Sequence, residues 1–325
     1  MEEIKFNIPI KDLAPEGIHG YYYMVPQFEG EEDNDIKKFK DNEYREFHLK
    51  ALLNRTSSQS LDINFNLDPE QGNSYLMIPE EHEGKKILKL KLSTSHGEFL
   101  FHKNKQNELS MLTFDCKAIS SKKAQSKFYL GITPYLDYLS YKFNVPVMID
   151  KISCEDKKNN ITSISYVAPY FPKSAAIAPY GIPEEMIPIF ALFREDKISS
   201  SPYYQFLCYF KILEGIYKKL RPELVVKAKL KNIPFKMEKE IIPSNAELRR
   251  YESVYIGKSI LTLFRTEFRN EYRHAVSHFS LDDGTMINLS DITYINKYQS
   301  IIEIIEISCR VVIENQLKLI EVINK

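Results

Sequence analysis

Arginine and histidine gather in one short segment of this chain, between Arg269 and His278. Two of the seven histidines lie there, and His274 follows Arg269 by five positions, as His278 follows Arg273. Histidine titrates near neutral pH and can give or accept a proton, whereas arginine presents a fixed fork of donors to phosphate oxygens. These residue types at this spacing indicate chemistry on a phosphate ester.

Breaking an RNA phosphodiester without a metal requires three functions. A base must take the proton of the 2′-hydroxyl, an acid must protonate the leaving 5′-oxygen, and positive charge must hold the phosphate. His278 is expected at a helix C-terminus, where the helix dipole favours the protonated ring and hence an acid or phosphate-binding role. The expected products are a 2′,3′-cyclic phosphate and a 5′-hydroxyl, and DNA should stay intact.

The angles within an α-helix separate the two residue types. Positions four apart differ by about 40° and positions five apart by about 140°. Arg269 and Arg273 would then form one row, and His274 and His278 a second row on another side of the helix. A two-fold axis would bring the arginine row of one chain near the histidine row of another. We therefore predict a homodimer with a shared site.

The same residues also fit a plainer interpretation. A helix that ends in arginine and histidine is often only a solvated face with favourable dipole contacts. An arginine followed closely by a histidine also arises by chance in a chain of this composition, so the spacing alone does not identify a site.

The elements that must position this segment read as helices. Ser201 followed by Pro202 predicts an N-cap with proline at the first helical position, and this helix is expected to end at Leu220–Pro222. A second helical pattern runs over residues 244–279, with an interruption near Gly257, and carries the arginine and histidine segment.

Residues 223–243 between these helices read as a basic, irregular connection. Lys227 and Lys229 within it, together with Asn270 beside Arg269, are the candidate substrate-binding residues. The lysines equally fit a solvated loop.

The stretch Arg273-His274-Ala275-Val276-Ser277-His278 resembles the motif of the HEPN superfamily, in which an arginine and a polar residue precede a histidine at a helix end. Arg269-Asn270 through His274 fits the same formula one turn earlier. The likeness to the MauJ/Apea-like branch of that superfamily extends to two earlier stretches, Ser201–Leu207 and Lys211–Gly215. The resemblance covers roughly residues 185–325.

This resemblance implies a dimeric helical bundle that cleaves RNA without metal or cofactor, with Arg273, His278, His274 and Arg269 as catalytic residues. It also implies a defence or toxin effector that acts on RNA and that has an antitoxin or another defence-system protein as a partner. Some HEPN members lack activity, so the alternative is a catalytically inactive scaffold or partner-binding protein.

The fold class expected for the whole chain is α+β. Residues 1–170 read as a β-rich α+β domain with a sensing or regulatory role, including a hairpin formed by Val145–Cys154 and Ile161–Val167. Pro134 is expected to break or kink a helix in this part. A proline-rich linker, Pro169–Pro183, separates it from an all-α HEPN-like domain over residues 184–325.

Composition narrows the classes of protein. The 44 basic and 44 acidic residues give a net charge of +0, which argues against a surface coated in positive charge. The four cysteines have no C-x-x-C spacing, so reduced thiols in a cytoplasmic protein are expected rather than a zinc ribbon. His96 and His102 have no evident third ligand, and neither a signal peptide nor a membrane-spanning segment is expected.

Overall fold

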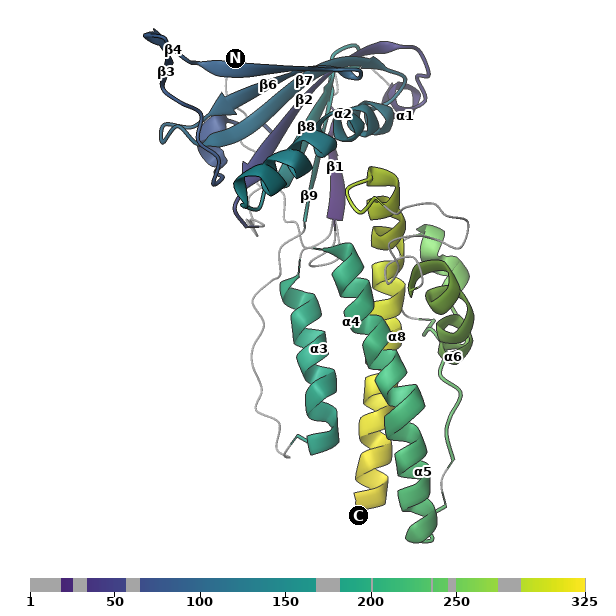
Figure 1. Cartoon of the computed structure of the whole chain (residues 1–325). Helices are drawn as coiled ribbons and strands as arrows, with labels where there is room; N and C mark the ends of the chain where they lie inside the picture. Colours follow the sequence, from purple (N-terminus) through teal and green to yellow (C-terminus); the bar gives the residue numbers. More distant parts are fainter. Residues whose placement is uncertain are drawn as a thin grey trace. The chain divides into compact units, whose positions relative to one another are not determined.

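The computed structural model describes residues 19–25, 34–56, 65–167, 182–199, 201–234, 236–244, 250–273 and 288–324. The chain divides into two compact units, which we call the sheet unit (Met1–Lys173 with Ser290–Ile292) and the helical unit (Ser174–Leu289 with Thr293–Lys325). An antiparallel sheet in the first and helices in the second confirm the expected α+β class (Figure 1). The predicted linker lies mostly at residues 168–181, outside the described residues, and stays a prediction.

Seven strands form the main sheet of the sheet unit, in the order β1-β9-β8-β2-β7-β6-β5. Each neighbouring pair is antiparallel. The strands are β1 (His19–Met24), β2 (Arg45–Asn54), β5 (Lys89–Thr94), β6 (Gly97–Lys103), β7 (Leu109–Ala118), β8 (Met148–Asp156) and β9 (Ile161–Val167). The unit also holds α1 (Asn34–Phe39), η2 (Pro69–Gln71), a ribbon of β3 (Glu81–His82) and β4 (Lys85–Lys86), and α2 (Ser121–Phe143).

Helix α2 packs on one face of this sheet, because alternate residues of β2 and its neighbours point inward. Phe128 and Ile132 of the helix are fully buried in the same core as Phe47 and Phe99 of the strands. The rings of Phe99 and Phe128 lie 5.6 Å apart. The predicted hairpin is confirmed, since Ile152–Asp156 of β8 pairs antiparallel with Ile161–Ser165 of β9.

Helix α2 continues through Pro134, so a break at this residue is wrong, and the alternative of a kink stays a prediction. Proline removes the hydrogen bond to the carbonyl four residues earlier, which belongs to Leu130. Both Pro134 and Leu130 are exposed, so water can take the place of the missing donor.

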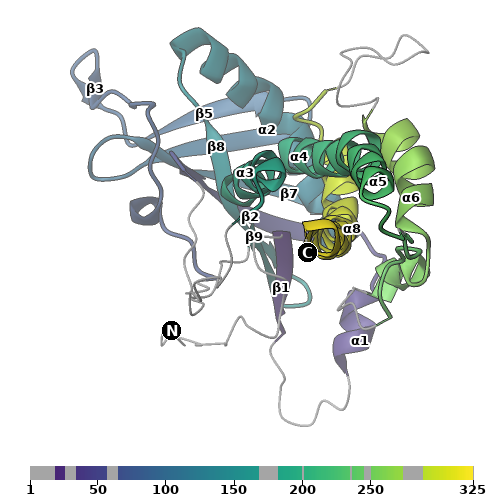
Figure 2. The same ribbon diagram turned by 90° about the horizontal axis from the view of Figure 1, so that it is seen from below.

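The helical unit consists of nine described elements. They are η3 (Glu184–Met186), α3 (Ile187–Ile198), α4 (Pro202–Gly215), η4 (Ile216–Leu220), α5 (Arg221–Leu230), η5 (Arg250–Tyr255), α6 (Ile260–Leu263), η6 (Phe264–Arg273) and α8 (Ile292–Asn324). Viewed nearly along α8, Figure 2 shows α3, α4, α5 and α6 in an arc beside that helix.

The 33-residue helix α8 is the element against which the others pack. Tyr298 of α8 lies 5.6 Å from Phe206 of α4, measured between ring centroids. Further along, the Cys309 thiol donates to the carbonyl of Tyr209 at 3.3 Å. The predicted N-cap of α4 is confirmed, because the Ser201 hydroxyl accepts a hydrogen bond from the backbone N–H of Tyr204.

The first predicted helix does not end at Leu220–Pro222, because η4 carries it directly into α5. The turn η4 is π-helical, and its wider winding changes which carbonyl lies behind Pro222. The proline ring then avoids the clash that it makes in an α-helix interior. Residues 223–230 are therefore helical rather than part of an irregular connection.

The predicted interruption near Gly257 is confirmed, because η5 ends at Tyr255 and α6 starts at Ile260. Gly257 has a φ of 77°, which favours glycine. Backbone hydrogen bonds hold the segment 240–242 against this break: Gly257 N donates to Ile242 O at 2.9 Å and Ile260 N to Glu240 O at 3.0 Å. Glu240 is thereby brought beside the start of α6.

Among the described residues, no helix has the length and apolarity that a membrane span requires. In the same part of the chain, no group of three or more histidine, cysteine, aspartate or glutamate side chains is placed to hold a metal ion.

One acidic side chain of the helical unit is buried among its helices. Asp196 at the end of α3 is 1% exposed, and Lys197 Nζ lies 3.7 Å from its carboxylate. The same ammonium group lies 2.7 Å from Glu306 of α8. Burial raises the pKa of Asp196 to about 6, because an ionised carboxylate is poorly solvated there.

This carboxyl group makes the stability of the helical unit depend on pH. Between about pH 4 and 6 the folded state keeps the proton of Asp196 while the unfolded state loses it, so stability falls as pH rises through this window. In the wild type, this carboxyl group should lower the free energy of unfolding by up to about 3 kcal/mol as the pH rises from 4 to 7. We expect Asp196→Asn to abolish this decrease, as measured by urea unfolding at each pH. The control Glu195→Gln, at a neighbouring and partly exposed position, should keep the wild-type pH profile. Identical profiles for the wild type and Asp196→Asn would contradict this account.

Candidate functional site

The arginines of η6 form a row on its outer side, with Arg265, Arg269 and Arg273 at every fourth position. Arg265 and Arg269 are exposed, and Arg273 is half-buried. Among the described residues, no carboxylate lies within ion-pair distance of these three guanidinium groups. We call these residues the arginine row.

A second row on η6 is apolar and faces the core. Phe264, Phe268 and Tyr272 are at most 7% exposed. The ring of Phe264 lies 5.0 Å from Phe210, and that of Tyr272 lies 5.5 Å from Phe206. Burial of these rings fixes the orientation of η6, so the intervening arginine row faces outward.

The carbonyl of Tyr272 accepts a hydrogen bond from the Tyr298 hydroxyl of α8 at 2.6 Å. This contact anchors the chain at Tyr272, the residue before Arg273. His274 and His278 follow in the sequence. Burial raises the pKa of Tyr272 to about 12, so its phenol stays protonated at neutral pH and does not act as a base.

The segment Phe264–Arg273 is π-helical, whereas the sequence pattern predicts an α-helix here. In a π-helix the backbone hydrogen bond joins residues five positions apart, so such positions lie over one another rather than on different sides. The angle of about 140° expected between positions five apart therefore does not apply to this segment. His274 and His278 lie outside the described residues, so their angles to the arginines are not described and the homodimer stays a prediction.

The other predicted site residues have different surroundings. Asn270 is exposed on η6, next to the arginine row. Lys227 and Lys229 lie on α5 rather than in an irregular connection, and Lys227 Nζ is 4.0 Å from Glu185. His274 and His278 lie outside the described residues, so their roles as proton donor and acceptor stay predictions.

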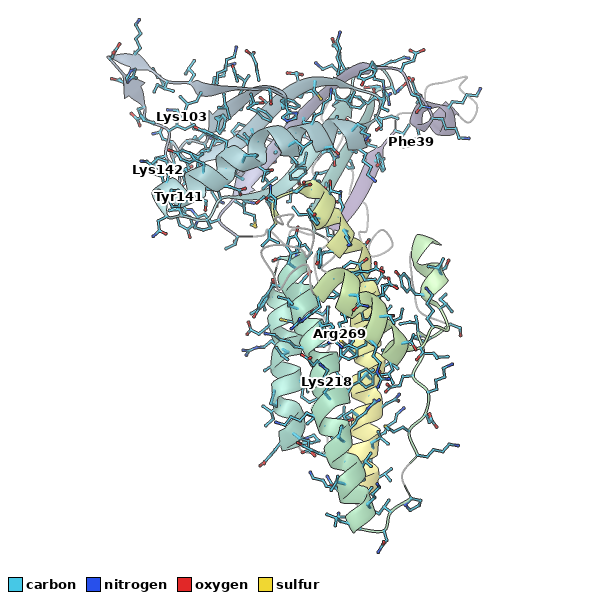
Figure 3. All side chains as sticks on the ribbon, turned by 45° about the vertical axis from the view of Figure 1, so that its right-hand side comes forward. Phe39, Lys103, Tyr141, Lys142, Lys218 and Arg269 are labelled. Carbon is cyan, nitrogen blue, oxygen red and sulfur yellow. The ribbon has the colours of Figure 1, made fainter. Side chains whose placement is uncertain are left out.

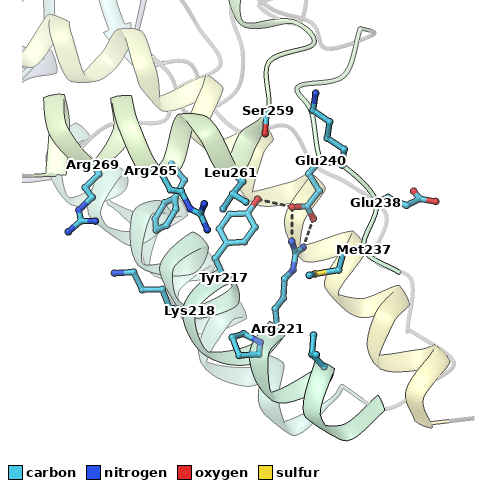
Figure 4. A pocket seen from close by; sticks show the side chains of 14 residues that line it. Tyr217, Lys218, Arg221, Met237, Glu238, Glu240, Ser259, Leu261, Arg265 and Arg269 are labelled. Carbon is cyan, nitrogen blue, oxygen red and sulfur yellow. Dashed lines mark hydrogen bonds and ion pairs between the residues drawn. The ribbon is translucent and has the colours of Figure 1, made fainter. Parts of the chain in front are cut away.

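A pocket of about 560 Å³ opens beside the arginine row (Figure 4). Of the predicted site residues that the structure describes, Arg269 alone lines it. The pocket also brings in Arg265 from η6 and Lys218 from η4, which the sequence analysis did not identify. Figure 3 shows Arg269 and Lys218 close together on the helical unit. The four-residue repeat of arginines was a visible signal for Arg265, but nothing in the sequence pointed to Lys218.

A buried ion pair forms the inner wall of this pocket. The guanidinium group of Arg221 donates through both terminal nitrogens to the two carboxylate oxygens of Glu240. The Tyr217 hydroxyl donates to the same carboxylate at 2.7 Å, and Asn315 Nδ2 donates to it at 3.2 Å. Burial and the hydrogen bond to Glu240 raise the pKa of Tyr217, so its phenol stays protonated and remains a hydrogen-bond donor. The carboxylate of Glu240 is thus satisfied by donors from within the helical unit.

Removing the cation from this pair should destabilise the fold strongly. We expect Arg221→Ala to lower the free energy of unfolding by about 3–5 kcal/mol, because the buried Glu240 carboxylate would lose its counter-charge. Urea unfolding followed by circular dichroism measures this change. The matched control is Arg194→Ala, whose surface pair with Glu195 should contribute less than about 1 kcal/mol. Equal losses in the two variants would show that the Arg221 pair has no special role.

The helical unit resembles one known family. The family model of the methylamine utilization protein MauJ matches residues 189–314, which include α4, η4, α5, the arginine row and the sequence positions of His274 and His278. No curated protein matches this chain, and no solved structure does. The match confirms the expected likeness to MauJ in the C-terminal part of the chain.

Proposed function

We propose that the helical unit is a HEPN-type endoribonuclease that cleaves RNA without a metal ion. The observation that carries this proposal is the arginine row, in which Arg265 and Arg269 are exposed and none of the three guanidinium groups has a carboxylate partner among the described residues. Three such groups at every fourth position supply the positive charge that a phosphodiester needs.

The helical winding of η6 also supports a functional site. π-Helices are rare, occur mostly as short insertions in α-helices, and are frequent where function requires an unusual placement of side chains. Here the winding covers Phe264–Arg273 within the described residues. The proposed roles follow from the residue types: Arg269 and Arg273 hold the phosphate, and His274 and His278 transfer protons.

In this proposal the active form is a homodimer, because one chain presents a single arginine and histidine segment and the resemblance to HEPN proteins implies two side by side. The sheet unit has a sensing or regulatory role. The protein acts as a defence or toxin effector, held in check by a partner protein.

RNA cleavage tests the reaction directly. The purified full chain, incubated with a mixed single-stranded RNA in excess EDTA, is expected to leave 2′,3′-cyclic phosphate and 5′-hydroxyl ends and to spare the matching DNA. We expect His278→Ala and Arg273→Ala each to slow cleavage at least about 100-fold, since each removes a proton-transfer or phosphate-binding group. Gel electrophoresis with end-group analysis measures both.

Lys219→Ala is the matched control, because this exposed lysine lies in η4 but does not line the pocket. It should cleave at the wild-type rate. Intact RNA after incubation with the wild-type chain, at concentrations where it binds RNA, would contradict the proposed reaction and favour a non-catalytic HEPN-like scaffold.

The oligomeric state is a separate test. We expect light scattering to give a particle of twice the chain mass of 38.0 kDa at micromolar concentration. A monomer that retains full RNA cleavage would rule out a site shared between chains.

A further inference from the structure

The pocket beside the arginine row combines positive charge with an apolar wall. Three of its cations come from two elements that lie side by side: Arg265 and Arg269 from η6, and Lys218 from η4. Lys239 of the segment 236–244 and Arg221 of α5 line it as well. In Figure 4 the free ends of these three side chains gather on the same side of the pocket. An anion at that position would contact three cationic groups at once.

Apolar side chains also line this pocket, in part next to the charged side chains Glu238 and Lys239. Pro222 and Val225 of α5, Met237 of the segment 236–244, and Leu261 of α6 line it. Met237 is 49% exposed, so this apolar surface is open to a ligand. Apolar side chains of this kind can pack against the face of a base, whereas the cations suit the attached phosphate. A cavity of about 560 Å³ lies within the size range of small-molecule sites.

The charges inside the pocket divide into two groups. Arg221 is committed to Glu240 in the buried pair, so neither is available to a ligand. Lys218 is paired with Glu214 one helical turn earlier, at 2.5 Å on the surface, and such an exposed pair contributes little. Arg265 has no ion-pair partner among the described residues. Lys218, Arg265, Arg269 and the exposed Lys239 are therefore the cations that a ligand phosphate can recruit, and the first two are the ones that we test.

We propose that this pocket binds one nucleotide of the RNA strand, next to the phosphodiester that the segment around Arg273 cleaves. Lys218 and Arg265 contact the phosphate, and the base packs on Met237 and Leu261. Arg269 lines the pocket and stands between Arg265 and Arg273 in the arginine row, so it connects the pocket with the cleavage site. This inference rests on the proposed function and adds a substrate-binding site that lies within one chain.

Binding of an RNA that cannot be cleaved tests the pocket separately from the reaction. The probe is a fluorescein-labelled, single-stranded, 2′-O-methyl RNA of twelve nucleotides, titrated with the full chain in EDTA and followed by fluorescence anisotropy. The test variant is Lys218→Ala with Arg265→Ala. The control is Lys219→Ala with Arg194→Ala, which removes the same charge from exposed positions that do not line the pocket.

We expect the pocket variant to bind at least about tenfold more weakly than the wild type, and the control to bind within about threefold. The salt dependence of binding should also decrease in the pocket variant, by about 0.7 in log–log slope for each phosphate that the protein no longer neutralises. Met237→Ala should weaken binding without changing this slope, because it removes an apolar contact only. Circular dichroism melting of each variant checks that the fold is intact.

The outcomes separate the two proposals. Weaker binding by the pocket variant, although the wild type cleaves no RNA, supports the pocket and overturns the reaction. Equal binding by the pocket and control variants overturns the pocket, even if the wild type cleaves RNA. A third outcome concerns adenosine monophosphate. Suppose that it binds the wild type but not the pocket variant, and that the wild type, the pocket variant and the control variant bind the 2′-O-methyl RNA equally. The pocket would then bind a free nucleotide, and this inference would be overturned.

Discussion

Burial of one face of η6 is the constraint on which the candidate site depends. Phe264, Phe268 and Tyr272 are nearly or fully buried against the aromatic rings of α4 and α8. Each aromatic pair of this kind contributes about 0.5–1.5 kcal/mol beyond its buried area, and the rotation of η6 is therefore strongly specified. Because the arginines alternate with these rings, the core determines where the positive charge appears on the surface.

The helical unit separates charges that stabilise the fold from charges that are free to bind. Arg221 and Glu240 are buried, satisfy one another and receive further hydrogen bonds from Tyr217 and Asn315. A buried pair of this kind costs desolvation energy, so its main effect is to fix the position of the segment 236–244 relative to α5. Arg265, Arg269 and Lys218 stay at the surface a short way along the same wall, where a phosphate can reach them.

The winding of η4 and η6 connects the fold with the proposed chemistry. Both π-helical segments belong to the pocket wall, and both contribute cations to it. The wide turn in η4 allows the chain to continue past Pro222 and so keeps Lys218 and Arg221 on one continuous helical stretch. In η6 it changes the relation between positions five apart within Phe264–Arg273, from which Arg265 and Arg269 reach the pocket.

The sequence by itself determined the features that depend on neighbouring residues. The α+β class, the N-cap at Ser201, the break at Gly257 and the β8–β9 hairpin each follow from residue types within a few positions of one another. The likeness of the C-terminal part to MauJ is confirmed too, whereas the phosphate chemistry indicated by the residue types of Arg269–His278 stays a prediction. Only the tertiary structure decided that Phe264–Arg273 winds as a π-helix and that the preceding helix passes through Pro222. It also decided that Lys218 and Arg265 line a pocket with Arg269. These features depend on contacts such as Arg221 with Glu240 and Tyr272 with Tyr298, which join residues 19 and 26 positions apart. No local pattern encodes such pairings, because they form only when separate helices pack together.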